Sequence, residues 1–390
     1  MINILKFLFK ALAILLVIGI VFLACSVWFG FYDIVGLELY KDETISDIIP
    51  YYDNIYVITE DGYCYVLGGY DNSSSRKYRN SESYHNDKLN TPSPVKIFDE
   101  KVLQVVPYGS TGALLITEDG RLFDFNDFDI KEIYNNVSCA VKAPSSQGKR
   151  IFGSDNTALY YVIDKTNVLF AVNENGESKE LFSQVSEVDV YLDKILVLDK
   201  NGALNQYQIS ENSEIMLTEK LFEGVSSFDV KDTSLRYDGE KFIFDDEDAK
   251  NMPLLNVLTN DGELYVKGAY NLLCCTRSLA SHPEPKIYNE WTLIAENVES
   301  FSLAPMGTAI KHMDSTAGYY GFDTDNSANS NFEFGYLKLA QTNVVDVYAS
   351  DVQVLIKSEQ AFYTWGYSLE YNVLDNEHNL FNGTPIIVYP

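Results

Sequence analysis

The chain has 390 residues, 46% of them hydrophobic, and it carries 56 acidic against 29 basic residues, a formal net charge of −27. A chain of this length buries a sizeable core. Its negative charge repels phosphate backbones and anionic lipid head groups, which disfavours nucleic-acid binding and adsorption to a membrane surface.

The N-terminus differs in composition from the rest of the chain. Lys6 and Lys10 precede residues 11–32 (ALAILLVIGIVFLACSVWFGFY), which contain no charge. A helix that rises ~1.5 Å per residue over this segment reaches ~33 Å, enough to cross a hydrocarbon core of ~30 Å. Because the lysines precede the span, we expect a cytoplasmic tail (1–10), a transmembrane signal anchor (11–32) and an extracytoplasmic body. This predicts a single-pass protein of the cell membrane.

Two other interpretations of this segment stay open. A cleaved signal peptide normally has a shorter apolar region of 7–15 residues. A lipid-modified Cys25 is the other alternative, although the apolar run continues beyond this cysteine. The length of the run favours the uncleaved anchor.

A hairpin pattern recurs after the anchor. In NIYVITEDGYCYVLGGYDN (54–72), two apolar runs flank an acidic turn that contains glycine. Such turn residues tolerate tight or left-handed backbone, and the flanks suit a half-buried strand. Related stretches occupy 113–127, 158–176, 194–210, 254–271, 308–326 and 352–372.

A short strand, in most copies ending in an aromatic residue, separates these hairpins. Its copies are LELY (37–40), VKIF (95–98), KEIY (131–134), KELF (179–182), EKLF (219–222), PKIY (285–288), YLKLA (336–340) and IIVY (386–389). A further apolar strand follows most copies. Residues 181–190 and 221–230 match at Leu, Phe, Val, Ser, Asp and Val, which indicates internal repetition.

These features together predict an all-β fold. Eight boundary strands enclose seven intervals of roughly 50 residues, each with about four strands, as a seven-bladed β-propeller of four-stranded antiparallel blades requires. We expect the transmembrane helix first, then a connector and first strand (33–44) and the propeller (45–390). TPIIVY (384–389) is placed to complete the blade begun at the other terminus, which would hide the sheet edges.

Two further features bear on this architecture. No pattern typical of a helix follows residue 44. The longest interval contains RYDGEKFIFDDEDAKN (236–251), which is an extra hairpin, a loop, or a degenerate eighth blade.

The tails of several hairpins resemble a known repeat. LGGYDNSSS (67–75), KGAYNLLCC (267–275) and WGYSLEYNVL (365–374) resemble the tryptophan-glycine segment of regulator of chromosome condensation repeats. The TEDG and NDG turns and the Pro-containing TPSPVKIF (91–98) look like the rest of that repeat. The resemblance covers about 37–390 and lacks the glycine segment in the third and fourth units. It implies a seven-bladed propeller.

The resemblance says less about activity, because function lies on loops carried by a fold. The founding member of the family is a nuclear exchange factor that binds chromatin, an activity that an acidic, exported chain is not expected to share. The exported branch of the family includes an inhibitory protein that binds its target with aromatic-rich propeller loops. This analogy favours protein binding.

No residue set with the chemistry of a catalytic, cofactor or metal site is evident. G-x-S-x-G, H-E-x-x-H and phosphate-loop motifs are absent, and the histidines are scattered at His85, His282, His312 and His378. Residues 323–329 (DTDNSAN) imitate the start of a calcium loop, but Ala328 and Phe334 replace the glycine and glutamate that such a loop needs. FDDED (244–248) is typical of a solvated acidic turn.

Cysteine usage is low. Cys25 lies in the predicted span, and Cys64, Cys139, Cys274 and Cys275 lie outside it without zinc-type spacing. Four cysteines allow three disulfide pairings, among which the sequence does not choose.

We therefore expect a membrane-anchored, extracytoplasmic protein-protein interaction module with a monomeric body, no cofactor and no nucleic-acid ligand. Its negative charge is typical of a soluble surface, and a basic partner or bound cations are the more specific interpretations. One alternative is an enzyme acting on glycan or peptide through carboxylates at the propeller channel; another is a structural envelope protein. Acids converging on the channel would favour the enzyme, and a contiguous patch of Tyr and Trp on one rim would favour binding.

Overall fold

The computed structural model describes most of the chain after residue 44. The described residues are 45–51, 54–68, 95–109, 112–126, 129–143, 147, 151–152, 159–210, 214–231, 236–237, 242–243, 250–271, 284–322, 334–350, 353–359, 362–366 and 385–386. Their regular structure is β-strand, apart from helical backbone at residues 147 and 151–152. The expected tail, anchor and connector (1–44) lie outside the described residues. No helix in the described part is long and apolar enough to span a membrane.

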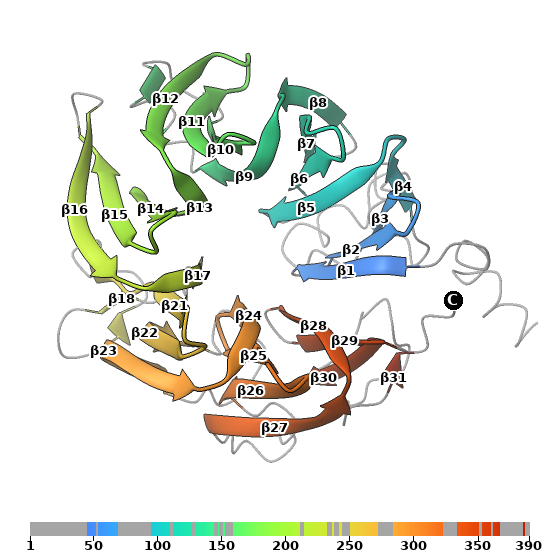
Figure 1. Cartoon of the computed structure of the whole chain (residues 1–390), viewed down its shortest axis with the longest axis vertical. Helices are drawn as coiled ribbons and strands as arrows, with labels where there is room; N and C mark the ends of the chain where they lie inside the picture. Colours follow the sequence, from blue (N-terminus) through green and yellow to red (C-terminus); the bar gives the residue numbers. More distant parts are fainter. Residues whose placement is uncertain are drawn as a thin grey trace, which may run out of the picture.

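Seven four-stranded antiparallel sheets form a ring, and we number these blades in chain order (Figure 1). Blade 1 comprises β1 (Ile45–Tyr51), β2 (Asn54–Thr59), β3 (Cys64–Gly68) and β4 (Val95–Phe98). Blade 2 comprises β5 (Val102–Tyr108), β6 (Gly112–Thr117), β7 (Leu122–Asn126) and β8 (Asp129–Tyr134). Blade 3 comprises β9 (Val137–Ala143), β10 (Leu159–Asp164), β11 (Val168–Asn173) and β12 (Ser178–Ser183).

The remaining blades follow the same order. Blade 4 comprises β13 (Val185–Tyr191), β14 (Lys194–Asp199), β15 (Leu204–Ile209) and β16 (Ile215–Phe222). Blade 5 comprises β17 (Val225–Lys231), β21 (Leu254–Thr259), β22 (Leu264–Tyr270) and β23 (Lys286–Ala295). Blade 6 comprises β24 (Val298–Ala304), β25 (Gly307–His312), β26 (Thr316–Phe322) and β27 (Phe334–Thr342). Blade 7 comprises β28 (Val344–Ala349), β29 (Gln353–Ser358), β30 (Phe362–Gly366) and β31 (Pro385–Ile386).

The predicted class, an all-β propeller with four-stranded antiparallel blades, is confirmed by this pairing. The first strand of each blade lies nearest the centre of the ring, and the last lies at its perimeter (Figure 1). The insert at 236–251 contributes β18 (Arg236–Tyr237), β19 (Phe242–Ile243) and β20 (Lys250–Asn251), which pair with one another as a small sheet between β17 and β21. The insert is therefore an excursion from blade 5 and does not form an eighth four-stranded blade.

The prediction that 384–389 completes a blade begun at the N-terminus was wrong. β31 pairs with β30 of its own blade, and β1 pairs with β2. The repeat begins with the innermost strand, so each blade is built from one continuous stretch of chain. First and last blades therefore meet without exchanging a strand.

The turns between the second and third strands link neighbouring blades. The third residue of these turns has positive φ at Gly62, Gly120, Asn167, Gly202, Gly262 and Ser315. Its carbonyl accepts a hydrogen bond of 2.7–3.0 Å from the first residue of the next inner strand. Glycine and asparagine tolerate this left-handed backbone, which explains the recurrence of EDG, KNG and NDG. At Gly202 an added Cβ would also lie 3.0 Å from the Val225 carbonyl oxygen.

Each inner strand begins with a β-bulge, where the register shifts by one residue. In four blades the second residue of the strand is a serine whose hydroxyl donates to two carbonyls of the paired strand. These serines are Ser46, Ser138, Ser186 and Ser226. Leu103, Glu299 and Val345 take this position in blades 2, 6 and 7.

The core lies between blades. Buried Val, Ile, Leu and Tyr side chains form apolar clusters at each interface from blades 1 and 2 to blades 6 and 7. At the perimeter, an aromatic residue of one outer strand contacts an aromatic residue of the next blade. The ring centroids lie 4.5–6.5 Å apart in Phe98–Phe123, Tyr134–Phe170, Phe182–Tyr207, Phe222–Tyr265 and Tyr288–Tyr320.

Candidate functional site

Polar and charged side chains cluster at two positions in the ring. The first is on the inner strands β13 and β17, and the second lies where blades 7, 1 and 2 meet. In inner strands such as β13, β17 and β28, the first residue is buried, the second is exposed, and half-buried positions then alternate with buried ones.

The inner strands of blades 4 and 5 bring three carboxylates together. Glu187 and Asp189 lie on β13, and Asp229 lies on β17. The Phe228 backbone N–H donates to the Glu187 carboxylate at 3.3 Å, and the Lys231 ammonium lies 2.9 Å from Asp229. The bond from Phe228 to Glu187 joins blade 5 to blade 4, whereas the contact between Lys231 and Asp229 lies within β17, so Glu187 has a structural role there.

Burial makes two of these acids weak. Burial raises the pKa of Glu187 to about 8, and the negative charges of Asp229 and Asp189 raise it further. The hydrogen bond from the Phe228 N–H acts in the opposite direction and lowers this pKa. Burial likewise raises the pKa of Asp189 to about 7, although Lys231 opposes the shift. The raised pKa favours the protonated form of Glu187 near neutral pH. No cluster of three or more His, Cys, Asp or Glu with metal-binding geometry occurs in the described ranges.

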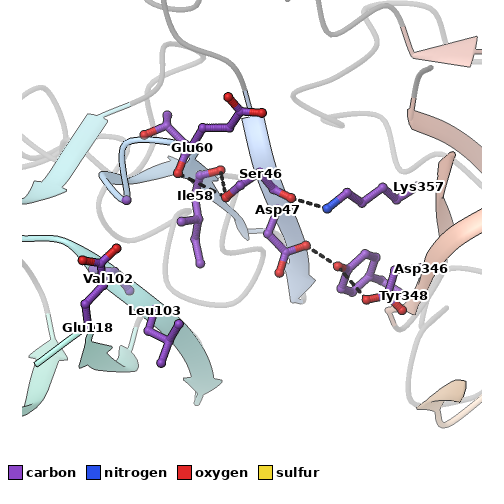
Figure 2. A pocket seen from close by; sticks show the side chains of 12 residues that line it. Ser46, Asp47, Ile58, Glu60, Val102, Leu103, Glu118, Asp346, Tyr348 and Lys357 are labelled. Carbon is purple, nitrogen blue, oxygen red and sulfur yellow. Dashed lines mark hydrogen bonds between the residues drawn. The ribbon is translucent and has the colours of Figure 1, made fainter. Parts of the chain in front are cut away.

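The second place is a cavity of about 310 Å³ at the seam between the last and the first blade (Figure 2). Blades 1, 2 and 7 all contribute to its walls. The lining side chains that carry charge are Asp47, Glu60, Glu118, Asp346 and Lys357. Sequence reasoning missed this cavity, because its walls come from segments at opposite ends of the chain.

Hydrogen bonds hold the seam together. The Tyr348 hydroxyl donates to Asp47 across the seam and also lies 3.2 Å from Asp346 on its own strand. The Lys357 ammonium donates to the Ser46 carbonyl (Figure 2). Burial, together with the charges of Asp47 and Asp346, raises the pKa of Tyr348 well above its usual range, so this phenol stays protonated as a donor.

The turns between the second and third strands of the blades differ in charge at their first exposed position. Glu60 and Glu118 are exposed at equivalent positions of two identical TEDG turns, and Glu359 takes that position in blade 7. Lys165 and Lys200 take it in blades 3 and 4. The twin TEDG turns are the sequence signal that could have indicated this site.

Two exposed apolar side chains belong to blades 2 and 7, the blades that carry Glu118 and Glu359. Leu103 is 64% exposed and Val345 is 41% exposed, both at the bulge position that serine takes in four other blades. Leu103 also lines the cavity. We call this surface the seam face and define it as Glu60, Leu103, Glu118, Val345 and Glu359.

A contiguous aromatic patch, which would have favoured the binding function, is not found among the described side chains. Tyr336 is the one large aromatic residue there that is strongly exposed, at 43%. Trp291 packs edge-on against Phe222 at 5.1 Å, and the Trp365 side chain lies outside the described set. Most described tyrosines instead pack between blades.

The other singled-out residues do not form a site. His312 is hydrogen bonded to the Tyr336 hydroxyl at 2.6 Å. Cys64 and Cys139 are unbonded thiols, and burial raises the pKa of Cys139 to about 12. The calcium-like segment, FDDED and the remaining histidines and cysteines lie outside the described residues.

Comparison with known proteins shows no family for this chain. No protein-family model and no curated protein matches the chain. Among solved structures, Prp20p from Saccharomyces cerevisiae is similar at 11% identity and a TM-score of 0.47, over 78% of this chain and 80% of that one. The computationally designed Ika8 protein is similar at 11% identity and a TM-score of 0.44, over 83% and 84% of the two chains. The C-terminal WD40 domain of Sif2 is similar at 9% identity and a TM-score of 0.44, over 83% and 80%.

At these identities and TM-scores the similarities do not assign the chain to a family. The protein's class, a β-propeller, follows from its own strand pairing. Its resemblance to regulator of chromosome condensation repeats stays a prediction from the sequence.

Proposed function

We propose that the protein is an interaction module whose seam face binds a segment of another protein. The observation that carries the proposal is the exposed pair Leu103 and Val345 at positions where other blades have serine. In those blades the serine hydroxyl bonds two carbonyls that the bulge leaves available. Leucine and valine cannot make these hydrogen bonds.

The presence of leucine and valine in place of serine lowers the stability of the isolated ring. A hydrogen bond of this kind contributes about 1 kcal/mol, and the apolar side chains also face water. Positions where a sequence departs from its own stabilising pattern are expected at functional sites. A partner that covers Leu103 and Val345 would recover the free energy of burying them.

The charge of the seam face supports a basic partner. At this turn position blades 1, 2 and 7, which include the blades of the two apolar residues, carry glutamate, whereas Lys165 and Lys200 occupy it in blades 3 and 4. This polarity would orient an approaching basic segment toward the seam and accelerate its association at low salt.

The proposal includes the location of the module. Residues 11–32 would hold the propeller at the cell membrane with the N-terminus cytoplasmic, because Lys6 and Lys10 precede this uncharged run. This location is tested in intact cells that express Lys200→Cys, by labelling with a thiol reagent that does not cross the membrane. Labelling without lysis is expected; labelling only after lysis would place the propeller in the cytoplasm.

The binding proposal is tested with the full chain in nanodiscs. Surface and secreted proteins of the source organism are captured by the wild type, by Leu103→Ser/Val345→Ser and by Leu217→Ser. Leu217 is the matched control, since it is 58% exposed on the perimeter strand β16. We expect one protein to be retained saturably by the wild type and the control and lost from the double variant. Equal retention by all three would contradict the proposal.

A hydrolytic enzyme is the second candidate. It is supported by the protonated Glu187 next to Asp189 and Asp229, because a carboxyl group with a raised pKa is suited to general acid catalysis. Turnover of extracellular glycans and peptides by the full chain, lost in Glu187→Gln, would establish it. No turnover on such panels would leave Glu187 with its role in joining blades 4 and 5.

A further inference from the structure

We propose that the seam cavity binds the side chain of a lysine or arginine from the partner protein. This inference rests on the proposed function, and it names the subsite and the chemistry of its ligand. The cavity opens beside the exposed Leu103, so a residue from a segment lying on the seam face would reach it.

The size of the cavity suits such a side chain. Its volume of about 310 Å³ would hold roughly ten water molecules at their liquid volume of about 30 Å³ each. A long flexible side chain fits this space, whereas a helix or an intact strand does not. The ligand is therefore one side chain entering from above.

The charge of the walls selects a cation. Four carboxylates and one ammonium line the cavity, which leaves a formal charge of −3. The ammonium group of Lys357 is bound to the Ser46 carbonyl. Asp47 and Asp346 both contact the Tyr348 hydroxyl, and each carboxylate retains further acceptor positions.

Glu60 and Glu118 complete the recognition. Both belong to exposed turns of adjacent blades, and among the described residues neither side chain has an ion-pair or hydrogen-bond partner. A lysine ammonium donates three hydrogen bonds and a guanidinium five, so either group could engage carboxylates from two blades at once.

The apolar walls suit the stem of the same side chain. Ile58, Val102 and Leu103 line the cavity together with the acids (Figure 2). Lysine and arginine bury their methylene groups against such surfaces while the charged end reaches polar atoms. A small cation would leave this apolar part unused, and no metal-binding cluster occurs in the described part of the chain.

Binding in this cavity has a structural consequence. Blades 7 and 1 exchange no strand, and the ligand would contact residues of blades 1, 2 and 7 simultaneously. A cationic side chain would therefore fasten the ring at its seam. Binding to the folded ring alone must also raise the temperature of unfolding.

The test uses the full chain in nanodiscs and four fluorescent pentapeptides that differ only at their central residue. That residue is lysine, arginine, norleucine or glutamate; norleucine keeps the apolar stem of lysine without its charge. Fluorescence anisotropy up to millimolar peptide measures affinity, and thermal unfolding is followed with each peptide. We expect the lysine and arginine peptides to bind about tenfold more tightly than norleucine, to raise the unfolding temperature, and to weaken as salt increases.

Two variants locate the site. Glu60→Gln/Glu118→Gln should lower the affinity for the lysine peptide about tenfold and leave norleucine unchanged. Asp261→Asn is the matched control, because Asp261 lies on the equivalent turn of blade 5. Equal affinity for lysine and norleucine, no binding of lysine at millimolar concentration, or equal losses in both variants would overturn the inference.

A failure of the cation-subsite inference can be distinguished from a failure of the proposed function. If the glutamine variant retains the captured partner while Leu103→Ser/Val345→Ser loses it, the seam face is the binding site and the cavity is not its cation subsite. If the Leu103 and Val345 variant retains the partner as well, the proposed function itself falls.

Discussion

The hydroxyl group of Tyr348, near the end of the chain, donates a hydrogen bond to the carboxylate of Asp47, near the start of the first blade. Their strands, β28 and β1, lie side by side at the seam without sharing a sheet. Because the chain does not pass from blade 7 to blade 1, as it does between every other pair of neighbouring blades, side-chain contacts carry more of the stability of this seam.

Removing this hydroxyl group should weaken the ring. Tyr348→Phe leaves Asp47 and Asp346 without their shared donor, and we expect the free energy of unfolding to fall by about 1–3 kcal/mol. Urea denaturation measures the change. Tyr134→Phe is the control, since the Tyr134 hydroxyl makes only an exposed contact of 3.5 Å with Ser178. Similar losses in both variants would argue against a special role for the seam.

A single glycine should be indispensable to blade 5. Gly268 has φ of +110°, and an added Cβ would lie 1.8 Å from the Pro253 carbonyl oxygen. Gly268→Ala must therefore move the backbone, and we expect a loss of at least about 2 kcal/mol. At Gly335 an added Cβ meets nothing within 4 Å. Gly335→Ala should therefore change stability very little. Thermal unfolding of the two variants measures the difference.

Leu103→Ser should stabilise the isolated protein. A serine there would gain the two carbonyl contacts that Ser186 makes in blade 4, and it would remove an exposed leucine, for a gain of about 1 kcal/mol. Ser186→Leu should destabilise by a similar amount. The urea midpoints of Leu103→Ser and Ser186→Leu, each compared with the wild type, test these two expectations. A destabilised Leu103→Ser would show that the leucine supports the ring.

Stability should fall with rising pH because of Glu187. Its pKa is about 8 in the folded protein and about 4.3 in an unfolded chain, so the folded state binds the extra proton between these values. The group's contribution is fully favourable below about pH 4.3 and declines until about pH 8, with a slope of at most about 1.4 kcal/mol per pH unit. Asp189, with a pKa of about 7, acts in the same direction.

Glu187→Gln should flatten this dependence. The variant keeps an acceptor for the Phe228 N–H and does not titrate. Urea midpoints from pH 5 to pH 8 should fall less in Glu187→Gln than in the wild type. Parallel curves would mean that water in the centre of the ring keeps the Glu187 pKa near its ordinary value.

Much of the architecture followed from local patterns. Turns such as EDG and KNG predicted hairpins because their third residue needs left-handed backbone, which Gly62 and Gly202 adopt. The aromatic ends of the boundary strands indicated where each blade ends, and in the structure Phe98, Tyr134 and Phe182 contact the next blade. Asn136, Asn297 and Asn343 gave an unused signal, since a left-handed residue immediately precedes these inner strands.

The seam and its cavity were decided only by the tertiary structure. Short-range patterns determine which residues pair into hairpins, because turn conformation and alternating burial act within one stretch of chain. The meeting of Asp47 with Tyr348, and of Glu118 with Asp346 in one cavity, depends on how the ring closes. That closure sums small rotations between all the blades, so no local pattern in the sequence specifies it. The acidic composition of the chain was evident at once; which acids share a cavity was set by the ring.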